Sequence, residues 1–333
     1  MACEPTEILR KAYFFTHNHA VPRNGFIHGG IDLVVEKATL PKIEVTDIEH
    51  RVDALDLGKI ARDWEQYGAF VVRGLMLPYA EQIREDLDAI TDEAISQLHL
   101  AEYVDGVGWT TPNKSLFIPA PSNYVRDKQV MLVGCNYRTS AAFFKSACDD
   151  IMLSIVTTLL GDNVELYQEG QCLVKEPVGG HPKKLHQDSS YFQHKYDGPV
   201  AALCYAVDTD AQKGALYVVP GSHRLGVLDH VDTVSHLGLD EDEWSWRDAV
   251  QITGRAGDAI FFHVDTIHGS QENHSDSRRP VFIHRYRGAD DYVVIGASTT
   301  KARKEAEKNI AQAKKDNQLG LLVSGRRSYD PGR

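Results

Sequence analysis

The sequence is poor in cysteine, and the few cysteines that it has are scattered. Only 5 of its 333 residues are cysteine, and no two of them form a Cys-x-x-Cys pair. Disulfide frameworks and zinc knuckles both need denser, paired cysteines. The pattern argues against either one and favours a reducing compartment, so we expect a cytoplasmic protein.

Long apolar runs and an excess of basic residues are also missing. No apolar run approaches the ~18 residues that a membrane-spanning helix needs. The chain has 36 Lys and Arg against 47 Asp and Glu, which gives a net charge of −11. This balance argues against nucleic acid or an anionic membrane as the main partner. A small-molecule substrate remains, and the oligomeric state stays open between a monomer and a homodimer.

The sequence contains no internal repeat, low-complexity tract or evident linker. With 42% hydrophobic and 25% charged residues, its composition is that of a globular protein that buries a sizeable core. We therefore predict one domain over residues 1–333. Its parts would be N-terminal helices with a substrate loop (1–163), a β core (164–296), and a C-terminal helix with a tail (297–333).

Helical periodicity is concentrated outside the predicted β core. Apolar residues recur at helical spacing in four segments. A strand-like run at 69–74 follows the first segment after Gly68, which we expect to end that helix. The predicted helices are 52–67, 77–98, 142–160 and 299–317.

Two stretches have the composition of functional loops. Residues 105–135 are irregular, with Gly, Pro and Asn between several aromatic and charged residues, and 225–250 interrupts the strand pattern. Long loops in compact domains are usually functional or disordered. We predict that 105–135 is an ordered loop, and that both stretches form a lid that selects the substrate.

From residue 164 onward, short strand-like runs follow one another with turn residues between them. A series of short strands at this spacing predicts a mainly β protein with flanking helices, built as an all-β barrel or jelly roll. The predicted strands are 164–175, 184–188, 200–207, 215–219, 249–252, 259–263, 281–286 and 292–295.

His186 and Asp188 are the strongest candidates for chemistry. Side chains two apart in an extended segment point to the same side, so the imidazole and the carboxylate would lie on one side of the backbone. His268, which follows another strand-like run, would complete a 2-His-1-carboxylate set of the kind that holds Fe(II) and leaves positions open. Each residue alone would more often be structural. Their combination predicts a metal site.

Arg279 is the candidate to bind a carboxylate beside that metal. A planar guanidinium holds a carboxylate through two parallel hydrogen bonds. Strand alternation places the rival, Arg278, on the opposite face, and it places Arg285 on the same face as Arg279. Ser270 shares its face with His268, so its hydroxyl would reach a ligand bound at the metal.

In these motifs the chain resembles the phytanoyl-CoA dioxygenase family of Fe(II)/2-oxoglutarate-dependent oxygenases. The likeness spans about residues 55 to 295, and the motifs are highly specific in combination. They are Tyr67-Gly68-x-Phe70-Val71-Val72-x-Gly74-Leu75, Leu173-Val174-Lys175-Glu176-Pro177, His186-Gln187-Asp188-x-x-Tyr191-Phe192, Gly214-Ala215-Leu216-x-Val218-Val219-Pro220-Gly221-Ser222-His223, and Gly257-Asp258-x-x-Phe261-Phe262-x-x-x-x-Ile267-His268-Gly269-Ser270-x-x-Asn273 with Arg279.

The resemblance implies a double-stranded β-helix core of the jelly-roll, cupin-like type. It implies Fe(II) bound by the two histidines and the aspartate named above, with 2-oxoglutarate and O2 as cosubstrates. Arg279 and Ser270 would hold the far carboxylate of 2-oxoglutarate. Gln171 and Lys175 lie where relatives often place cosubstrate or substrate contacts. Related halogenases lack the carboxylate ligand, so the presence of Asp188 favours hydroxylation.

The resemblance further implies a dioxygenase that oxidises a C–H bond of a small metabolite or natural product and releases succinate and CO2. We predict substrate contacts at Tyr191, Trp109 and Arg126. Desaturation, ring closure and oxidative demethylation use the same kind of iron site and stay open. A non-catalytic β-sandwich binding protein and a cupin-like metal hydrolase or isomerase are the rival hypotheses.

Overall fold

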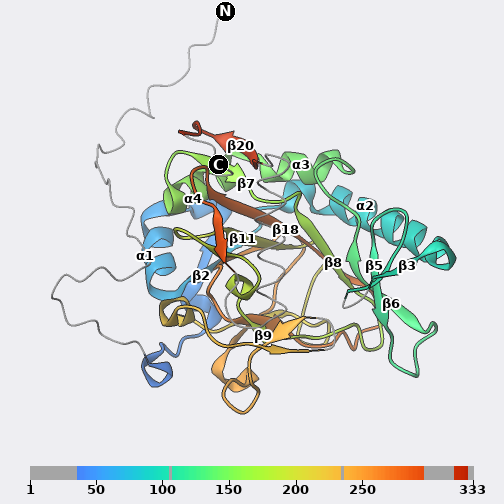
Figure 1. Ribbon diagram of the computed structural model, residues 1–333. Coiled ribbons are helices and arrows are strands. Elements are labelled where there is room, and N and C mark those ends of the chain that lie inside the picture. The colour runs from blue at the N-terminus through green and yellow to red at the C-terminus, as the bar shows by residue number, and fades with distance from the viewer. Residues whose placement is uncertain (1–35, 105–106, 234–235, 296–318, 329–333) are drawn as a thin grey trace, which may run out of the picture.

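The computed structural model describes residues 36–104, 107–233, 236–295 and 319–328. Most strands lie in one large sheet (Figure 1). Its strands are β1 (Glu49–Arg51), β2 (Ala69–Arg73), β3 (Glu102–Val104), β4 (Gly108–Thr110), β5 (Leu116–Pro119), β6 (Lys128–Val133), β7 (Val164–Leu166), β8 (Gln171–Lys175), β11 (Val200–Tyr205), β16 (Ala259–His263), β18 (Arg279–Gly288) and β20 (Leu321–Ser324). They run in the order β1-β2-β16-β11-β18-β8-β6-β5-β4-β3, and β7 pairs with both β18 and β20.

A second, four-stranded sheet lies over the large one, in the order β15-β12-β17-β9. The hydroxyl of Tyr205, on β11, joins the two sheets: it donates to Ile252 O at 2.6 Å and accepts from Leu216 N at 2.9 Å. Two short pairs, β10 with β19 and β13 with β14, flank these sheets. The remaining bounds are β9 (Lys183–His186), β10 (Gln193–His194), β12 (Leu216–Val218), β13 (Val231–Asp232), β14 (Leu237–Gly238), β15 (Val250–Ile252), β17 (His268–Ser270) and β19 (Val293–Ile295).

The helices cover the side of the large sheet that faces away from β9 (Figure 1). They are α1 (Leu57–Tyr67), α2 (Leu77–Ser96), α3 (Ala141–Ala147) and α4 (Asp150–Leu160). The carboxylate of Asp56 accepts Lys59 N and begins α1, and Gly68, at φ 66°, ends it as expected. The helices and the large sheet enclose the main hydrophobic core.

Strand β18 is buried on both faces and divides the core from the interior of the two sheets. Its even-numbered residues face the helices: His284 bonds Ser146 of α3 at 2.9 Å, and the Tyr286 hydroxyl donates to Ala147 O at 2.8 Å. Its odd-numbered residues, among them Arg279 and Arg285, face the second sheet. The strand therefore supplies core packing from one face and charged groups from the other.

The predicted fold class is confirmed: the protein is mainly β, with flanking helices and a cupin-like pair of sheets. The prediction of one continuous helix over 142–160 is wrong. It is two helices, because Cys148 and Asp149 interrupt it and the Asp149 carboxylate accepts Ile151 N and Met152 N to begin α4. A carboxylate in this position is among the most favoured ways to begin a new helix.

The prediction of an irregular loop at 105–135 is also wrong. Strands β4, β5 and β6 form an antiparallel meander that extends the large sheet outward from β8. Its Gly, Pro and Asn residues belong to the connections between short strands, which is the other common use of these residues. A loop that closes over the site is therefore not present among residues 107–135.

The described residues of 225–250 contain the short pair β13–β14 and a 3-10 turn at Trp246–Asp248. Strand β20, next to β7, was not predicted. The helix predicted at 299–317 lies outside the described residues. Within the described ranges, no helix combines the length and the apolar character that crossing a bilayer requires.

Candidate metal centre

His186 and His268 face one another across two neighbouring strands. They are direct partners in the antiparallel pair of β9 and β17, and their ring centroids lie 4.3 Å apart. Each Nδ1 lies at hydrogen-bond distance from a nearby backbone carbonyl, Lys184 O at 2.7 Å and Thr266 O at 2.9 Å. These bonds fix the ring orientation and leave both Nε2 atoms to bind a shared metal.

Asp188 completes the cluster from the first position of the 3-10 turn Asp188–Ser190. Its Oδ1 lies 3.8 Å from Nε2 of His186 and 3.8 Å from Nε2 of His268. The three candidate ligand atoms all lie within 4.8 Å of one another, and all three residues are buried. The strand has ended at His186, so a turn, and not strand alternation, aims the carboxylate.

The protonation states in the cluster suit a cation. Burial lowers the pKa of His186 to about 3 and also lowers that of His268, so both imidazoles are neutral. Burial alone would raise the pKa of Asp188, but this pKa lies below its ordinary value, and the nearby Arg285 guanidinium is the largest cause that lowers it. Neutral imidazole and ionised carboxylate are the forms that bind a metal.

Arg285 contacts the carboxylate oxygen of Asp188 that does not face the histidines. Its Nη2 lies 3.3 Å from Asp188 Oδ2, and its Nη1 donates to Gln171 Oε1 at 3.0 Å. From the sequence, we predict that Arg285 shares the face of Arg279, and the family resemblance implies that Gln171 lies near the cosubstrate. In the structure, Gln171 and Arg285 form one chain of contacts that ends at Asp188.

The structure separates the two neighbouring arginines. Arg279 is 2% exposed and lies inside, with its Cζ 5.6 Å from the Tyr205 ring centroid. Within the described part of the chain, its Nε and Nη2 have no hydrogen-bond partner. A buried guanidinium with unpaired donors is costly. These donors therefore fit an anion such as a carboxylate.

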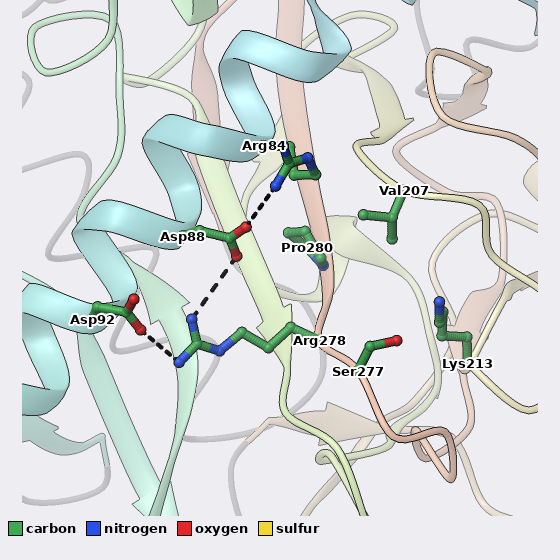
Figure 2. Close-up of a pocket in the computed structure, with 8 residues that line it drawn as sticks. All are labelled: Arg84, Asp88, Asp92, Val207, Lys213, Ser277, Arg278 and Pro280. Carbon is green, nitrogen blue, oxygen red and sulfur yellow. Dashed lines mark hydrogen bonds and ion pairs between the residues drawn. The ribbon is translucent and has the colours of Figure 1, made fainter.

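Arg278 points outward into a surface pocket of about 410 Å³ next to α2 (Figure 2). Its guanidinium pairs with Asp92 at 2.7 Å and lies 3.9 Å from Asp88. Asp88 also accepts from Arg84 at 3.0 Å. Ion pairs on α2 thus occupy Arg278, and this pocket is separate from the metal cluster.

Lys175 lies directly opposite Arg279 across the β8–β18 pair. Its Nζ donates to His181 O at 2.8 Å, to Ser270 O at 3.2 Å and to Gln271 O. Burial, together with the nearby Arg279, holds the pKa of Lys175 well below its ordinary value. Lys175 therefore ties β8 to the end of β17, where Ser270 lies, and its donors already have partners.

Lys183 is a residue that the sequence did not single out. A register shift in the β9–β17 pair places Lys183 opposite Ser270, and therefore on the face of His186 and His268. Its Nζ lies 3.3 Å from Met131 Sδ, and its charge lowers the pKa of His186 and Lys175. Simple strand alternation would put Lys184 on that face instead, because a bulge cannot be seen in a sequence pattern.

The three predicted substrate residues come from separate parts of the structure. Trp109, on β4, lies three strands beyond β8 and packs on Tyr103 with ring centroids 5.2 Å apart. Arg126 donates to the buried carboxylate of Glu176 at 2.6 Å. The Tyr191 hydroxyl, on the turn after Asp188, accepts Leu237 N at 2.6 Å. Of the three, only Tyr191 lies next to a candidate ligand in the chain.

The comparison with protein families gives one match over most of the chain. The model of the phytanoyl-CoA dioxygenase (PhyH) family matches residues 64–281. This range covers more than half of the sequence and includes His186, Asp188, His268 and Arg279.

Curated relatives match at modest identity. A probable alpha-ketoglutarate-dependent hypophosphite dioxygenase of Stutzerimonas stutzeri is 29% identical over 153 residues, 44% of this chain and 52% of that protein. The peroxisomal phytanoyl-CoA dioxygenase of Homo sapiens is 24% identical over 260 residues, 73% of this chain and 72% of that protein. The chain thus spans about half the length of the first relative and more of the second.

Solved structures share the fold. The non-haem, alpha-ketoglutarate-dependent carbocyclase SnoK from nogalamycin biosynthesis has a TM-score of 0.55 at 18% identity, over 82% of this chain and 95% of that one. The epimerase SnoN, in complex with Fe3+, alpha ketoglutarate and nogalamycin RO, has a TM-score of 0.53 at 18% identity, over 81% and 96% of the two chains.

A cupin-like pair of sheets thus encloses the buried cluster of His186, Asp188 and His268. The chain belongs to the phytanoyl-CoA dioxygenase family. The cofactors of this family are Fe(II), 2-oxoglutarate and O2. The recognition of the family from sequence motifs is thereby confirmed.

Proposed function

We propose that this protein uses Fe(II), 2-oxoglutarate and O2 to oxidise, most simply to hydroxylate, a C–H bond of a small-molecule substrate. Succinate and CO2 would be the coproducts. The observation that carries the proposal is the convergence of His186, Asp188 and His268 within 4.8 Å inside the two sheets. Three such ligands suit Fe(II) and leave coordination positions open.

We assign the three clustered side chains as the iron ligands. Both imidazoles are held by backbone carbonyls, and Arg285 holds the carboxylate, so little reorganisation is needed when the metal binds. When bound, the metal would supply the redox chemistry that activates O2. The protein would orient the substrate and exclude water from the site.

Arg279 would bind the far carboxylate of 2-oxoglutarate. Its buried, unpaired Nε and Nη2 support this role, and the ion pairs of Arg278 argue against the neighbour. Ser270, two residues after His268, would support the same carboxylate. Lys183 and Arg285 add positive charge to this interior. We expect Lys175 to act by fixing the end of β17.

The proposed substrate is a small molecule. Hydroxylation is the simplest outcome, since Asp188 occupies the position that a halide would need. Ring closure, desaturation and demethylation would use the same ligands. We propose that residues 1–333 act as one catalytic domain. The described 225–233 and 236–250 pieces, next to Tyr191 and β9, are the better candidates to cover the substrate.

Succinate formation tests this proposal. The wild-type protein should release succinate and CO2 from 2-oxoglutarate when Fe(II) and O2 are present, and a metabolite library should contain a compound that stimulates this release. His186→Ala and Asp188→Ala should abolish it. His263→Ala, a buried residue on β16 outside the cluster, should lower it only through stability. A folded protein that neither binds Fe(II) nor forms succinate would overturn the proposal.

A further inference from the structure

Strand β9, which ends at His186, is an edge strand. Its ladder partner is β17, and the opposite edge has no strand in the four-stranded sheet. An edge leaves backbone N–H and C=O groups that need other partners when they are buried. The position of the segment that carries His186 and Asp188 therefore depends on the groups that cover this edge.

Two histidines cover it with their side chains. His236 Nε2 accepts Lys184 N at 2.8 Å, and His230 Nε2 accepts Gln187 N at 2.9 Å. Between them, Leu239 N donates to Leu185 O at 2.8 Å. The bonded amides lie on either side of His186 and directly before Asp188. Both imidazoles thus hold the backbone that aims the ligands.

The tautomers of these histidines agree with that role. His230 Nδ1 lies 2.9 Å from Leu228 O, a carbonyl that can only accept, so Nδ1 carries the proton and Nε2 is the acceptor. His236 Nδ1 lies 3.1 Å from Thr233 Oγ1, which is compatible with the same tautomer. His230 and His236 are both buried. The His236 ring also lies 5.7 Å from that of His186.

Gln187 lies between His186 and Asp188 in the sequence, and its side chain connects this segment with the residues that precede His268. Its Nε2 donates to Gly226 O at 2.8 Å and to Asp265 O at 2.7 Å, and its Oε1 accepts Leu228 N at 2.8 Å. Asp265 precedes Thr266, whose carbonyl holds His268. One network therefore connects residues 226–233 and 236–239 with all three proposed ligands.

We propose that His230 and His236 are positioning residues of the metal centre, which complete the free edge of β9 and hold His186 and Asp188 in place for the metal. The inference rests on the proposed function, because it assumes that the cluster binds a metal. Neither histidine would contact the metal or a substrate. Loss of a partner that orients a ligand typically weakens metal affinity about 10- to 100-fold.

Anaerobic titration of the full chain with Fe(II), and with Mn(II) as a redox-silent probe, tests the inference. His230→Leu and His236→Leu should each raise the metal dissociation constant about tenfold or more. His230→Gln and His236→Gln should recover most of the affinity, since a Gln carbonyl can reach the position of Nε2. His230→Asn and His236→Asn stay polar but are too short, and should behave like the Leu variants if the latter do not fold.

His284→Leu is the matched control. His284 is also buried and hydrogen-bonded, but it lies on the helix-facing side of β18. Its loss should lower the unfolding temperature and leave the metal dissociation constant unchanged. Equal metal affinity in wild type and the Leu and Asn variants would overturn the inference, as would an equal loss in His284→Leu. A wild-type protein that binds neither metal would instead remove the metal centre, and the proposed function with it.

Discussion

The guanidinium of Arg285 lies 3.3 Å from the carboxylate of Asp188, measured from Nη2 to Oδ2, while Oδ1 of the same carboxylate faces the two imidazoles. One oxygen is thus paired with a cation from the protein, and the other is left for a metal. The arrangement holds a buried negative charge in place before any metal binds, which limits the cost of burying it.

Replacement of Arg285 should therefore weaken metal binding. In Arg285→Met, the Asp188 carboxylate loses its cationic partner and is free to rotate, so we expect the Mn(II) dissociation constant to rise about 10- to 100-fold. Anaerobic titration measures this change. Arg278→Met, the same substitution at a surface residue, should have no effect. An Arg285→Met protein with wild-type affinity would show that the pair does not orient the ligand.

The two neighbouring arginines should differ in their effect on 2-oxoglutarate. Arg279→Lys removes the planar, two-point contact with a carboxylate, and we expect KM for 2-oxoglutarate to rise roughly tenfold or more. Arg278→Lys keeps a cation that can still pair with Asp92 and should leave this KM nearly unchanged. Succinate formation at a series of 2-oxoglutarate concentrations provides the comparison. Equal effects would contradict the assignment of Arg279.

Two adjacent lysines give a second matched comparison. Lys183 faces the interior, whereas Lys184 pairs with Glu241 at 2.9 Å on the surface. Lys183→Met removes a positive charge near the anion-binding interior, and a loss of about 1 kcal/mol corresponds to roughly fivefold weaker 2-oxoglutarate binding. Binding can be followed on the Mn(II)-loaded protein. An equal effect of Lys184→Met would contradict a specific role of Lys183 in 2-oxoglutarate binding.

Stability should fall as the pH is lowered from 7 to 5, and His284 should contribute to the fall. Burial lowers its pKa to about 3 in the folded protein, against 6.5 for an ordinary histidine. Between these values the unfolded chain binds the extra proton, so the stability that the neutral imidazole provides is lost as the pH drops below 6.5. The expected slope is about 1.4 kcal/mol per pH unit for each such group.

Urea unfolding at several pH values measures this slope. The His284→Leu variant should be less stable than wild type at pH 7, but its stability should depend less steeply on pH, by about the slope of one such group. His181, whose pKa burial also lowers to about 3, contributes in the same direction and remains in the variant. An unchanged slope would contradict this prediction, because it would mean that His284 binds a proton equally in the folded and the unfolded protein.

Strand alternation identified the correct side of β18 because this strand is long and regular. The sequence placed Arg279 and Arg285 together and Arg278 apart, and the structure shows that arrangement. The same argument failed in β9. A bulge turns Lys183, and not Lys184, toward the face of His186. A 3-10 turn, and not the alternation of side chains along a strand, directs Asp188 toward His186.

Other features depend on tertiary contacts that a single sequence does not reveal. Residues 105–135 contain turn residues and aromatics that fit a functional loop and a meander equally well, and only the pairing of β6 with β8 decides between them. His230 and His236 belong to no motif, because their role comes from docking against an edge strand. A hydrogen-bond acceptor for another segment's backbone leaves no spacing signature.

The burial of β18 on both faces also restricts how this protein can change in evolution. A one-residue insertion near its middle would exchange the inward and outward side chains beyond that point. Arg285 would then point into the apolar helix layer, and His284 would point at the proposed iron ligands. Length variation should therefore be confined to the connections between strands, and homologues with altered substrates should differ there while this strand keeps a constant length.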